Sequence, residues 1–240
     1  MTISSTFVFS LSAVQAAETR QAVSANNVAN VSTAGFKSQR ATQSDMRGGG
    51  TQVRSIDTLG HQGPILRTSG SMDLSIAGNG FFQLQNASGA AVYSRDGSFK
   101  LDGMGRMVDS SGNLLQPPIT VPAGAQSLQV NSDGRIGAVM PNGGVQDLGQ
   151  IQLAQFTNPG GLLRAGDNLL TPTAASGAAQ AGMPGRGSLG TLIPGALEGS
   201  NVDLAAEMVD QIVNQRAFEA NIKPMRTADE MLGTLLDLKQ

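Results

Sequence analysis

Residues 200–238, SNVDLAAEMVDQIVNQRAFEANIKPMRTADEMLGTLLDL, form the longest stretch of this chain whose apolar side chains recur at intervals of three and four. This spacing predicts an amphipathic α-helix. Ser200 and Asp203 have the spacing of a capping box, so we expect the helix to begin at Ser200. Pro224 cannot donate a backbone bond to the carbonyl of Ala220, which predicts a kink there. The apolar face comprises Val202, Ala205, Val209, Ile212, Val213, Phe218, Ile222, Met225, Ala228, Met231, Leu232, Leu235 and Leu236.

The N-terminal segment carries a second apolar face of the same kind. Its members are Phe7, Leu11, Val14, Ala17, Ala22, Ala25 and Val28, and Ser4, Ser5 or Thr6 is available as the N-cap. Residues 6–17 are mildly apolar and end in small residues, as a secretory signal peptide does, but no Lys or Arg precedes Arg20, and polar residues interrupt the apolar run. The sequence therefore predicts two terminal helices.

The first helix ends in a run rich in asparagine, residues 25–37, ANNVANVSTAGFK. Gly35 suits a position past the helix end that requires positive φ, and Ser32 and Thr33 can bond nearby backbone groups. Asparagine is unfavourable inside a helix, so the amides of Asn26, Asn27 and Asn30 are expected to bond the following loop or a neighbouring chain.

Composition narrows the functional class. The chain has 240 residues, 40 % of them hydrophobic, but only 4 % aromatic and 14 % charged, with 31 glycines. A net charge of −2 gives no basic surface for nucleic acid. The absence of cysteine excludes a disulfide framework, a thiolate metal site and a cysteine nucleophile.

The amino-acid composition changes twice along the middle of the chain. Residues 38–71 are polar, and Gly48, Gly49 and Gly50 among them are expected to form a flexible link. Short alternating runs then predict about ten strands, separated by Asp-Gly and Asn-Gly turns, in a compact sheet, barrel or sandwich. These runs are 72–76, 81–84, 91–95, 98–101, 106–109, 114–116, 119–121, 128–130, 135–140 and 145–156. Residues 157–190 are mostly small and predict an exposed loop before a last strand within 192–197.

Nothing in the sequence assembles a catalytic or metal site. His61 is the only histidine and lies in a glycine-flanked polar segment typical of a solvated loop. The Asp-Gly pairs lack the ligand spacing of a calcium loop. We therefore expect no enzyme activity, no catalytic residues, no cofactor, no metal, no nucleic acid and no small-molecule substrate.

Three parts of the sequence together resemble one family. Residues 26–37, NNVANVSTAGFK, resemble the N-terminal signature of the bacterial flagellar rod, hook and hook-associated proteins. The run 197–203, LEGSNVD, together with 207–209, 215–219 and 229–232, resembles the terminal helix of the same family. Residues 80–82, 93–99 and 131–135 are similar to the middle domain of its rod and hook subunits.

The resemblance implies an α+β fold. Long N- and C-terminal helices, residues 1–38 and 199–240, would pack together as a coiled-coil-like stem. Residues 39–71 would form an extended connecting loop that contacts neighbouring subunits. Residues 72–198 would form a mainly β central domain, with 157–190 as its exposed loop. Hook proteins carry an inserted domain for which this chain has no room, so the rod is the better match.

The resemblance also implies a function and a set of site residues. The chain would be a structural subunit of the flagellar basal-body rod, a self-assembling helical tube that transmits motor torque and encloses the export channel. Its partners would be further copies, other rod proteins, the hook, the export apparatus and the surrounding P and L rings. Export would leave it in the periplasm-spanning basal body without a cleaved signal peptide. The family motif is Asn26, Asn27, Asn30, Ser32, Thr33, Gly35 and Phe36, and the residues expected to pack between subunits are Phe7, Leu11, Val14, Val28, Val202, Val209, Ile212, Phe218, Ile222, Leu232 and Leu235.

Two alternatives stay open beside the rod. One is a hook-type axial subunit, and the other is an exported β-domain binding module whose helices only complete its own fold. A binding module would concentrate its apolar residues in the β region, whereas this chain places its longest apolar faces at the two ends. The sequence does not separate a proximal from a distal rod protein.

Overall fold

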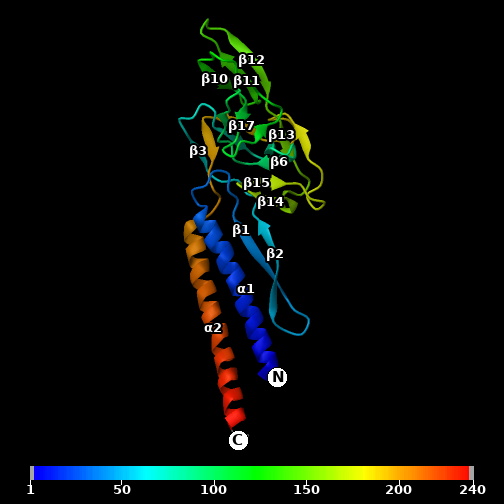
Figure 1. Cartoon of the computed structure of the whole chain (residues 1–240), viewed down its shortest axis with the longest axis vertical. Helices are drawn as coiled ribbons and strands as arrows, with labels where there is room; N and C mark the ends of the chain where they lie inside the picture. The colour runs from blue at the N-terminus through cyan, green and yellow to red at the C-terminus, as the bar shows by residue number, and fades with distance from the viewer. Residues whose placement is uncertain (1–2, 238–240) are drawn as a thin grey trace. The chain divides into compact units, whose positions relative to one another are not determined.

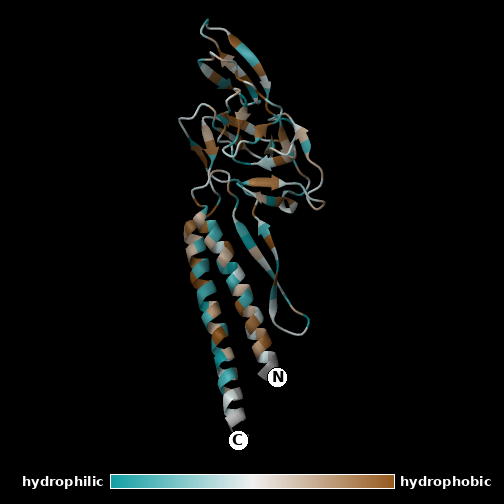
Figure 2. Ribbon diagram, viewed as in Figure 1, coloured by the Kyte–Doolittle hydropathy of each residue, from teal (hydrophilic) through white to brown (hydrophobic). Residues whose placement is uncertain are grey.

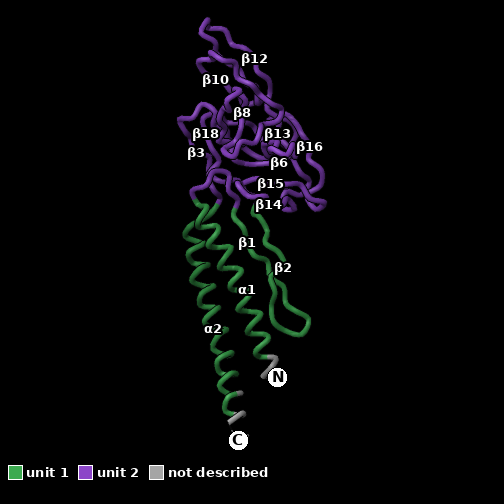
Figure 3. Tube along the Cα trace, in the orientation of Figure 1, with its two compact units in different colours: residues 1–31, 38–59, 202–240 green, residues 32–37, 60–201 purple. Residues whose placement is uncertain are grey.

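The computed structural model describes the backbone of residues 3–237 and the side chains of 6–231, 233 and 234. The chain divides into two compact units, shown in different colours in Figure 3. Unit 1 comprises residues 1–31, 38–59 and 202–240, and unit 2 comprises residues 32–37 and 60–201. Figure 1 labels the elements that build each unit. The fold is α+β, with a helix near each end of the chain and a β-rich region between them.

Unit 1 is built on an antiparallel pair of helices, α1 (Ile3–Ala29) and α2 (Leu204–Asp237) (Figure 1). The start of α2 lies beside the end of α1, because Ser24 Oγ donates to the backbone oxygen of Glu207 at 3.3 Å. Further along, Thr6 of α1 lines a common cavity with residues 220–231 of α2. The prediction of two terminal helices is confirmed.

The second helix begins four residues later than expected. Asp203 is the N-cap, since its Oδ1 accepts from the backbone nitrogens of Ala205 at 3.0 Å and Ala206 at 3.2 Å. The expected start at Ser200 is wrong because residues 199–201 belong to unit 2 and bond within it: Gly199 N donates to Pro64 O at 2.7 Å. Val202, expected on the helix face, therefore precedes the helix. Pro224 lies inside α2 and does not end it.

A β-hairpin completes unit 1, where the sequence predicted a loop. Strand β1 (Gln39–Asp45) pairs antiparallel with β2 (Thr51–Thr58), and both pack against α1. The three glycines form the tip, and two of them pack on the helix: a Cβ on Gly49 would lie 2.7 Å from the Phe9 ring, and one on Gly50 2.6 Å from Ser12 Oγ. The flexible link and the extended loop over 39–71 are thus wrong. The polar strands offered no alternation of apolar residues to reveal them.

Unit 2, which lies entirely in the described part of the chain, is built from antiparallel strands. Its largest sheet has nine strands, in the order β14-β15-β6-β5-β9-β8-β7, with β13 pairing to both β5 and β16. Their bounds are β5 (Phe81–Gln85), β6 (Ala91–Ser94), β7 (Lys100–Leu101), β8 (Met107–Val108), β9 (Leu114–Leu115), β13 (Leu153–Gln155), β14 (Leu163–Gly166), β15 (Leu169–Thr171) and β16 (Gln180–Gly182). Residues 119–121, expected as a strand, make only one isolated bridge, between Arg106 and Thr120.

Three smaller sheets complete unit 2. Strands β10 (Ser127–Val130), β11 (Arg135–Val139) and β12 (Val145–Gln150) form one of them. Strand β4 (Leu74–Ala77) pairs with β17 (Thr191–Pro194), and β3 (Ile65–Arg67) pairs with β18 (Ala196–Glu198). The pairing of β3 with β18 brings residues 65–67, near the start of the long segment of unit 2, next to residues 196–198, which shortly precede α2.

The main core of unit 2 lies between these sheets and is fully buried. Its members are Leu74, Ile76, Phe82, Leu84, Val92, Phe99, Met107, Leu115, Ile119, Ile136, Ile151, Leu153 and Leu192. Figure 2 shows hydrophobic residues gathered in these strands and recurring along both helices. A second cluster, around Phe81, Tyr93 and Phe156, includes Leu162. The expected exposed loop over 157–190 is therefore wrong, because it contributes Leu162, a 3₁₀ turn η1 (Pro159–Gly161) and strands β14 to β16.

Candidate functional site

The asparagine-rich end of α1 joins three elements of unit 1 through one side chain. Asn27 is buried, and its Nδ2 donates to Gln39 O at 2.8 Å and to Glu207 Oε1 at 2.7 Å. Its Oδ1 accepts from the backbone nitrogen of Gln39 at 2.8 Å. Asn27 thus ties the end of α1 to the start of β1 and to the first turn of α2. Asn27 thus bonds the segment that follows α1, as expected, but that segment is strand β1 and not a loop.

The other two asparagines belong to the helix end itself. Asn30 Nδ2 donates to Asn26 O at 2.9 Å, and its backbone nitrogen lies within bonding distance of the Asn26 and Asn27 carbonyls. Asn26 is exposed. Ser32 is also exposed, and Thr33 accepts a backbone bond from Phe36 at 3.3 Å. These residues end α1 and turn the chain.

Gly35 has the positive φ that the sequence predicted, at 67°. It is not the residue that follows the helix, however, because α1 ends at Ala29. Its nitrogen instead donates to Glu198 O at 2.7 Å, and a Cβ here would lie 2.6 Å from Asp96 N. Only glycine fits both the backbone conformation and the space.

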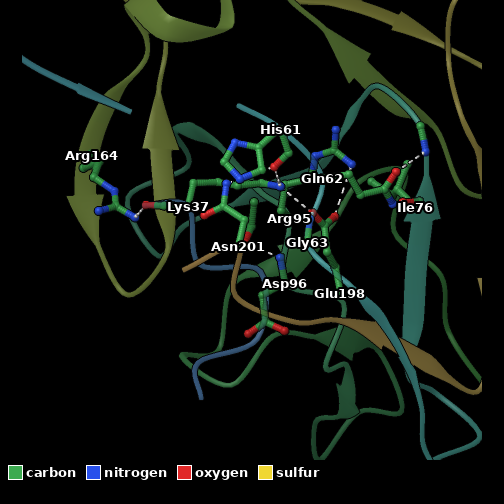
Figure 4. Close-up of polar contacts among 12 residues, drawn as sticks. Lys37, His61, Gln62, Gly63, Ile76, Arg95, Asp96, Arg164, Glu198 and Asn201 are labelled. Atoms are coloured by element: carbon green, nitrogen blue, oxygen red, sulfur yellow. Dashed lines mark hydrogen bonds and ion pairs between the residues drawn. The ribbon is translucent and has the colours of Figure 1, made fainter. Parts of the chain in front are cut away.

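Next to Gly35, unit 2 contains a buried ionic cluster that Figure 4 shows in close-up. Glu198 is 1 % exposed, and its Oε1 accepts from Lys37 Nζ and, at 3.0 Å, from Gly63 N. Its Oε2 lies 3.4 Å from Arg95 Nη1. Lys37 Nζ also donates to His61 O at 2.9 Å. One carboxylate therefore connects segments that lie up to 161 positions apart in the chain.

Arg164 and Asn168 hold the same segment from its other side. The Arg164 guanidinium lies 4.5 Å from the centre of the buried Phe36 ring and donates to Lys37 O at 3.2 Å. Asn168 Nδ2 donates to Ala34 O at 3.0 Å. The second half of the family motif, Gly35 to Lys37, is thus anchored in unit 2 through main-chain and side-chain contacts.

Burial dominates the electrostatics of this cluster. It lowers the pKa of Lys37 below its ordinary value, although the hydrogen bond and the charge of Glu198 act in the opposite direction. Burial also lowers the pKa of Arg95, again against the attraction of Glu198. Two cations share one carboxylate, and Arg95 Nε is buried without a hydrogen-bond partner. The arrangement fixes segments in place and offers no exposed reactive group.

The apolar residues expected to pack between subunits fall into three groups. Val14 is buried within unit 1, whereas Val28, Val202, Phe218 and Ile222 are half-buried. Phe7, Leu11, Val209 and Ile212 are exposed. Leu232 and Leu235 lie in α2, but their side chains are outside the described residues. Their role between subunits stays a prediction.

The first half of α2 has its polar side toward α1. Glu207 bonds Asn27. Asn214 lies seven residues further along α2, on the same side of the helix, and is 7 % exposed. On the other side, Met208, Val209 and Ile212 are between 52 % and 59 % exposed, and Val213, which borders a cavity shared with α1, is 55 % exposed. This half of the helix thus leaves a broad apolar face uncovered.

Sequence reasoning gave no role to several residues that proved central. Lys37, Arg95 and Glu198 stood in the motifs that carried the family resemblance, and Glu207 stood in the terminal helix, but nothing local reveals their partners. His61 is exposed, as expected, and it contributes only its backbone oxygen, to Lys37 and to Asn201 Nδ2 at 3.0 Å.

The described part of the chain shows no group of three or more His, Cys, Asp or Glu side chains that could hold a metal ion. Among the residues that the structure describes, neither helix combines the length and apolar character that crossing a membrane requires.

Three family models match the sequence. Residues 8–37 match the flagella basal body rod protein model, residues 75–138 match the flagellar hook protein FlgE/F/G D1 domain, and residues 193–238 match the flagellar basal body rod FlgEFG protein C-terminal model. The first and third matches contain the two ends that meet in the Lys37–Glu198 cluster.

Flagellar rod proteins of other bacteria match this chain over nearly their whole length, whereas a hook protein matches over a smaller part. The flagellar basal-body rod protein FlgG of Bacillus subtilis is 38 % identical, covering 93 % of this chain and 94 % of that protein. FlgG of Caulobacter vibrioides is 37 % identical, with 90 % and 92 % covered. The flagellar hook protein FlgE of Escherichia coli is 39 % identical, but the match covers 64 % of this chain and only 39 % of that protein.

Proposed function

Because the chain belongs to the family of bacterial flagellar basal-body rod proteins, we propose that its two terminal helices assemble it into a helical tube that transmits motor torque. The chain is a structural rod subunit and not an enzyme. It is located in the flagellar basal body and associates with other flagellar components. The proposal concerns how these associations are made.

The observation that carries the proposal is the exposed apolar face of α2. A helix of a self-contained domain directs its apolar side chains toward the core and its polar side chains toward water. Residues 204–214 of α2 do the reverse, with Glu207 and Asn214 toward α1 and Val209 and Ile212 exposed. Exposed apolar side chains such as these are stabilised when another protein surface covers them.

We propose a coiled-coil-like stem in which helices of neighbouring copies cover these faces. Phe7, Leu11, Val209 and Ile212 supply exposed contacts, and Val14, Val28, Val202, Phe218 and Ile222 support them from within or near the pair. Leu232 and Leu235 belong to the apolar face that the sequence predicts for this helix. Packed helices resist bending along their axis, and a contact that repeats without closing generates a helical tube. Such a tube both transmits torque and encloses a channel.

The β-rich unit 2 has a different role in this proposal. Its apolar side chains are gathered in a closed core, with Phe82, Leu84 and Leu153 fully buried, so unit 2 can fold on its own contacts. We propose that unit 2 meets other rod proteins, the hook and the surrounding P and L rings. The cluster around Glu198 keeps its two chain ends, residues 33–37 and 198–201, fixed against each other.

The alternatives are less well supported. A hook-type subunit is disfavoured because the hook protein of Escherichia coli is covered over only 39 % of its length, against 94 % for the rod protein of Bacillus subtilis. A binding module is disfavoured because its helices would cover their own apolar residues, and those of α2 are exposed.

A deletion strain tests the proposal. Images of basal bodies from cells lacking this chain should show a shortened rod without hook, and cells should not swim; the wild-type chain supplied in trans should restore both. The position at which the rod stops would distinguish a proximal from a distal subunit. A full-length rod in the deletion strain would overturn the proposal.

Export without cleavage is tested separately. We propose that the flagellar export apparatus carries the chain with its N-terminal segment intact, because Val14, Ala16 and Ala17 are buried in α1 and support the helix pair. Mass spectrometry of the assembled protein should find peptides from residues 1–17, allowing for loss of the initiator Met. A mature start near Ala17 or Glu18 would indicate a cleaved signal peptide.

A further inference from the structure

Lys37 places an amino group in the interior of unit 2, next to a second cation. Lys37 and Arg95 are each 6 % exposed, and both contact the carboxylate of Glu198. Two cations therefore share one anion, and the cluster holds one positive charge more than Glu198 can neutralise. Lysine can lose its proton, whereas arginine cannot, and burial lowers the pKa of Lys37. A neutral lysine amine is a nucleophile.

An electrophile is bound to the same backbone oxygen as this amine. Lys37 Nζ donates to His61 O at 2.9 Å, and Asn201 Nδ2 donates to that oxygen at 3.0 Å (Figure 4). The backbone nitrogen of Asn201 also donates to Phe36 O at 3.3 Å, immediately before Lys37. Both the side chain and the main chain of Asn201 thus hold its amide close to the amine of Lys37.

We propose that Lys37 Nζ and Asn201 Cγ become joined by an amide bond, which closes unit 2 with an internal cross-link. The neutral amine attacks Cγ, the new C–N bond replaces the bond from Cγ to Nδ2, and one molecule of ammonia leaves. Glu198 Oε1, which accepts from Nζ, takes the proton that Nζ loses and passes it to the departing nitrogen. Glu198 ends as the carboxylate that it was at the start, and no further reactant is needed.

The product suits the buried site better than the ions do. The new amide nitrogen keeps one hydrogen, which can continue to bond His61 O, while Lys37 loses its charge. Arg95 then has Glu198 as a countercharge of its own, so the excess positive charge is gone. The fold also favours the reaction rate, because holding an amine and an amide in one site makes their reaction intramolecular.

The bond would join the two separate segments of unit 2. Lys37 is the last residue of the segment 32–37, and Asn201 is the last residue of the segment 60–201. A covalent bond between these ends would bear a load that an ion pair alone would have to resist. The structure shows the chain before this reaction, so stability measurements on freshly folded protein report the free lysine. The inference goes beyond the proposed function and does not depend on it.

Mass spectrometry of the purified, folded full-length chain tests the bond. After storage at neutral pH, the denatured wild type should be lighter than its sequence by the mass of one ammonia. Trypsin does not cleave after an acylated lysine, so its digest should contain one branched peptide made of residues 21–40 and 187–216. Succinimide formation at Asn142, which precedes Gly143, also releases ammonia, but it produces no branched peptide.

Two variants assign the residues. Asn201→Ala removes the amide that is attacked, and it should keep the full mass of its sequence. Gln62→Ala is the matched control, because the Gln62 amide follows His61 directly but donates to Ile76 O at 2.6 Å. It should lose ammonia and give the branched peptide as the wild type does. A branched peptide from Asn201→Ala would show that Lys37 attacks a different group and would overturn the assignment.

The wild type alone decides whether the bond exists, whatever the variants do. A digest that contains residues 21–37 and 38–40 as separate peptides, and no branched peptide, would overturn the inference. Neither result changes the assignment of the chain as a rod subunit, which the basal bodies of the deletion strain test independently.

Discussion

Asn27 and Glu207, which lie 180 positions apart in the chain, are joined by a 2.7 Å hydrogen bond from Asn27 Nδ2 to Glu207 Oε1. The same amide bonds both the nitrogen and the oxygen of Gln39. Three elements, α1, β1 and α2, therefore meet at one buried side chain. The amide of Asn27 donates two hydrogen bonds and accepts a third, which a serine or threonine hydroxyl cannot do because it has one hydrogen to donate.

Asn27→Asp should weaken this junction. The substitution replaces a donor with a carboxylate oxygen that faces Glu207, so two hydrogen bonds are lost and two like charges approach each other. We expect the free energy of unfolding of the helix pair to fall by about 2–4 kcal/mol. Helical circular dichroism during urea unfolding of the assembled protein, in which the helices are ordered, would measure it. Asn26→Asp, at the exposed neighbouring position, should change it by less than about 0.5 kcal/mol, and an equal loss in both variants would contradict the assignment.

Gly35→Val should disrupt unit 2 by two effects. A β-branched residue at φ 67° costs roughly 1–2 kcal/mol, and its Cβ would clash with the backbone at Arg95 and Asp96. The segment through Lys37 would have to move, so swimming in soft agar should be lost. Gly143→Val is the matched control, because Gly143 has φ 77° but no atom within 4 Å of the Cβ site. Normal swimming by Gly35→Val at normal protein levels would show that the motif does not need this geometry.

Glu198→Gln should destabilise unit 2 strongly, because it leaves Lys37 and Arg95 buried without a countercharge. Breaking a buried pair in this way costs about 3–5 kcal/mol. Asp133→Asn removes the exposed partner of Arg135 and should cost less than about 1 kcal/mol. Thermal unfolding of both variants would compare the two. Similar losses would mean that Glu198 is not the centre of the cluster.

Lys37 should make stability depend on pH in the alkaline range. Burial lowers its pKa in the folded state, whereas an unfolded lysine titrates near 10.5. Between these two values the unfolded chain binds more protons, so the contribution of Lys37 to the free energy of unfolding rises with pH. The difference between wild type and Lys37→Met should therefore increase as pH approaches 10.5. A difference that falls with pH would mean that the attraction of Glu198 outweighs burial.

The sequence predicted elements that depend on local pattern. Both helices, most strands of unit 2 and the positive φ of Gly35 follow from spacing or from turn chemistry, and the structure confirms them. The hairpin over residues 39–58 could not be predicted, because its polar strands are stabilised by contacts with α1. The start of α2 at Leu204 depends on residues 199–201 bonding elsewhere, which is a tertiary effect.

In the candidate site, too, some residues could be predicted from local sequence and others depend on tertiary contacts. Asn27 was recognisable because three asparagines in five residues do not favour a helix and require partners. Glu198 and Lys37 are separated by 161 positions, and neither has a local signal that reveals a buried ion pair. The apolar stripe of α2 predicted an amphipathic helix, but only the structure shows that its first half has the polar side toward α1.

The uncovered faces of α1 and α2 lead to the last prediction, which concerns the free monomer. Isolated amphipathic helices are marginal in water, and this pair is held in part by polar contacts such as Ser24 with Glu207. In dilute protein, the amides of residues 1–35 and 200–240 should therefore exchange with solvent much faster than those of strands β5 and β6, whose side chains belong to a closed core. Polymerisation would slow exchange in the helices because neighbouring copies cover Phe7, Leu11, Val209 and Ile212. Ordering the helices costs conformational entropy. This cost opposes assembly anywhere except at a growing end, where neighbouring copies supply the covering contacts. Equal protection of the helices and of β5 and β6 in the monomer would show a self-contained helix pair and would contradict the coupling of helix order to assembly.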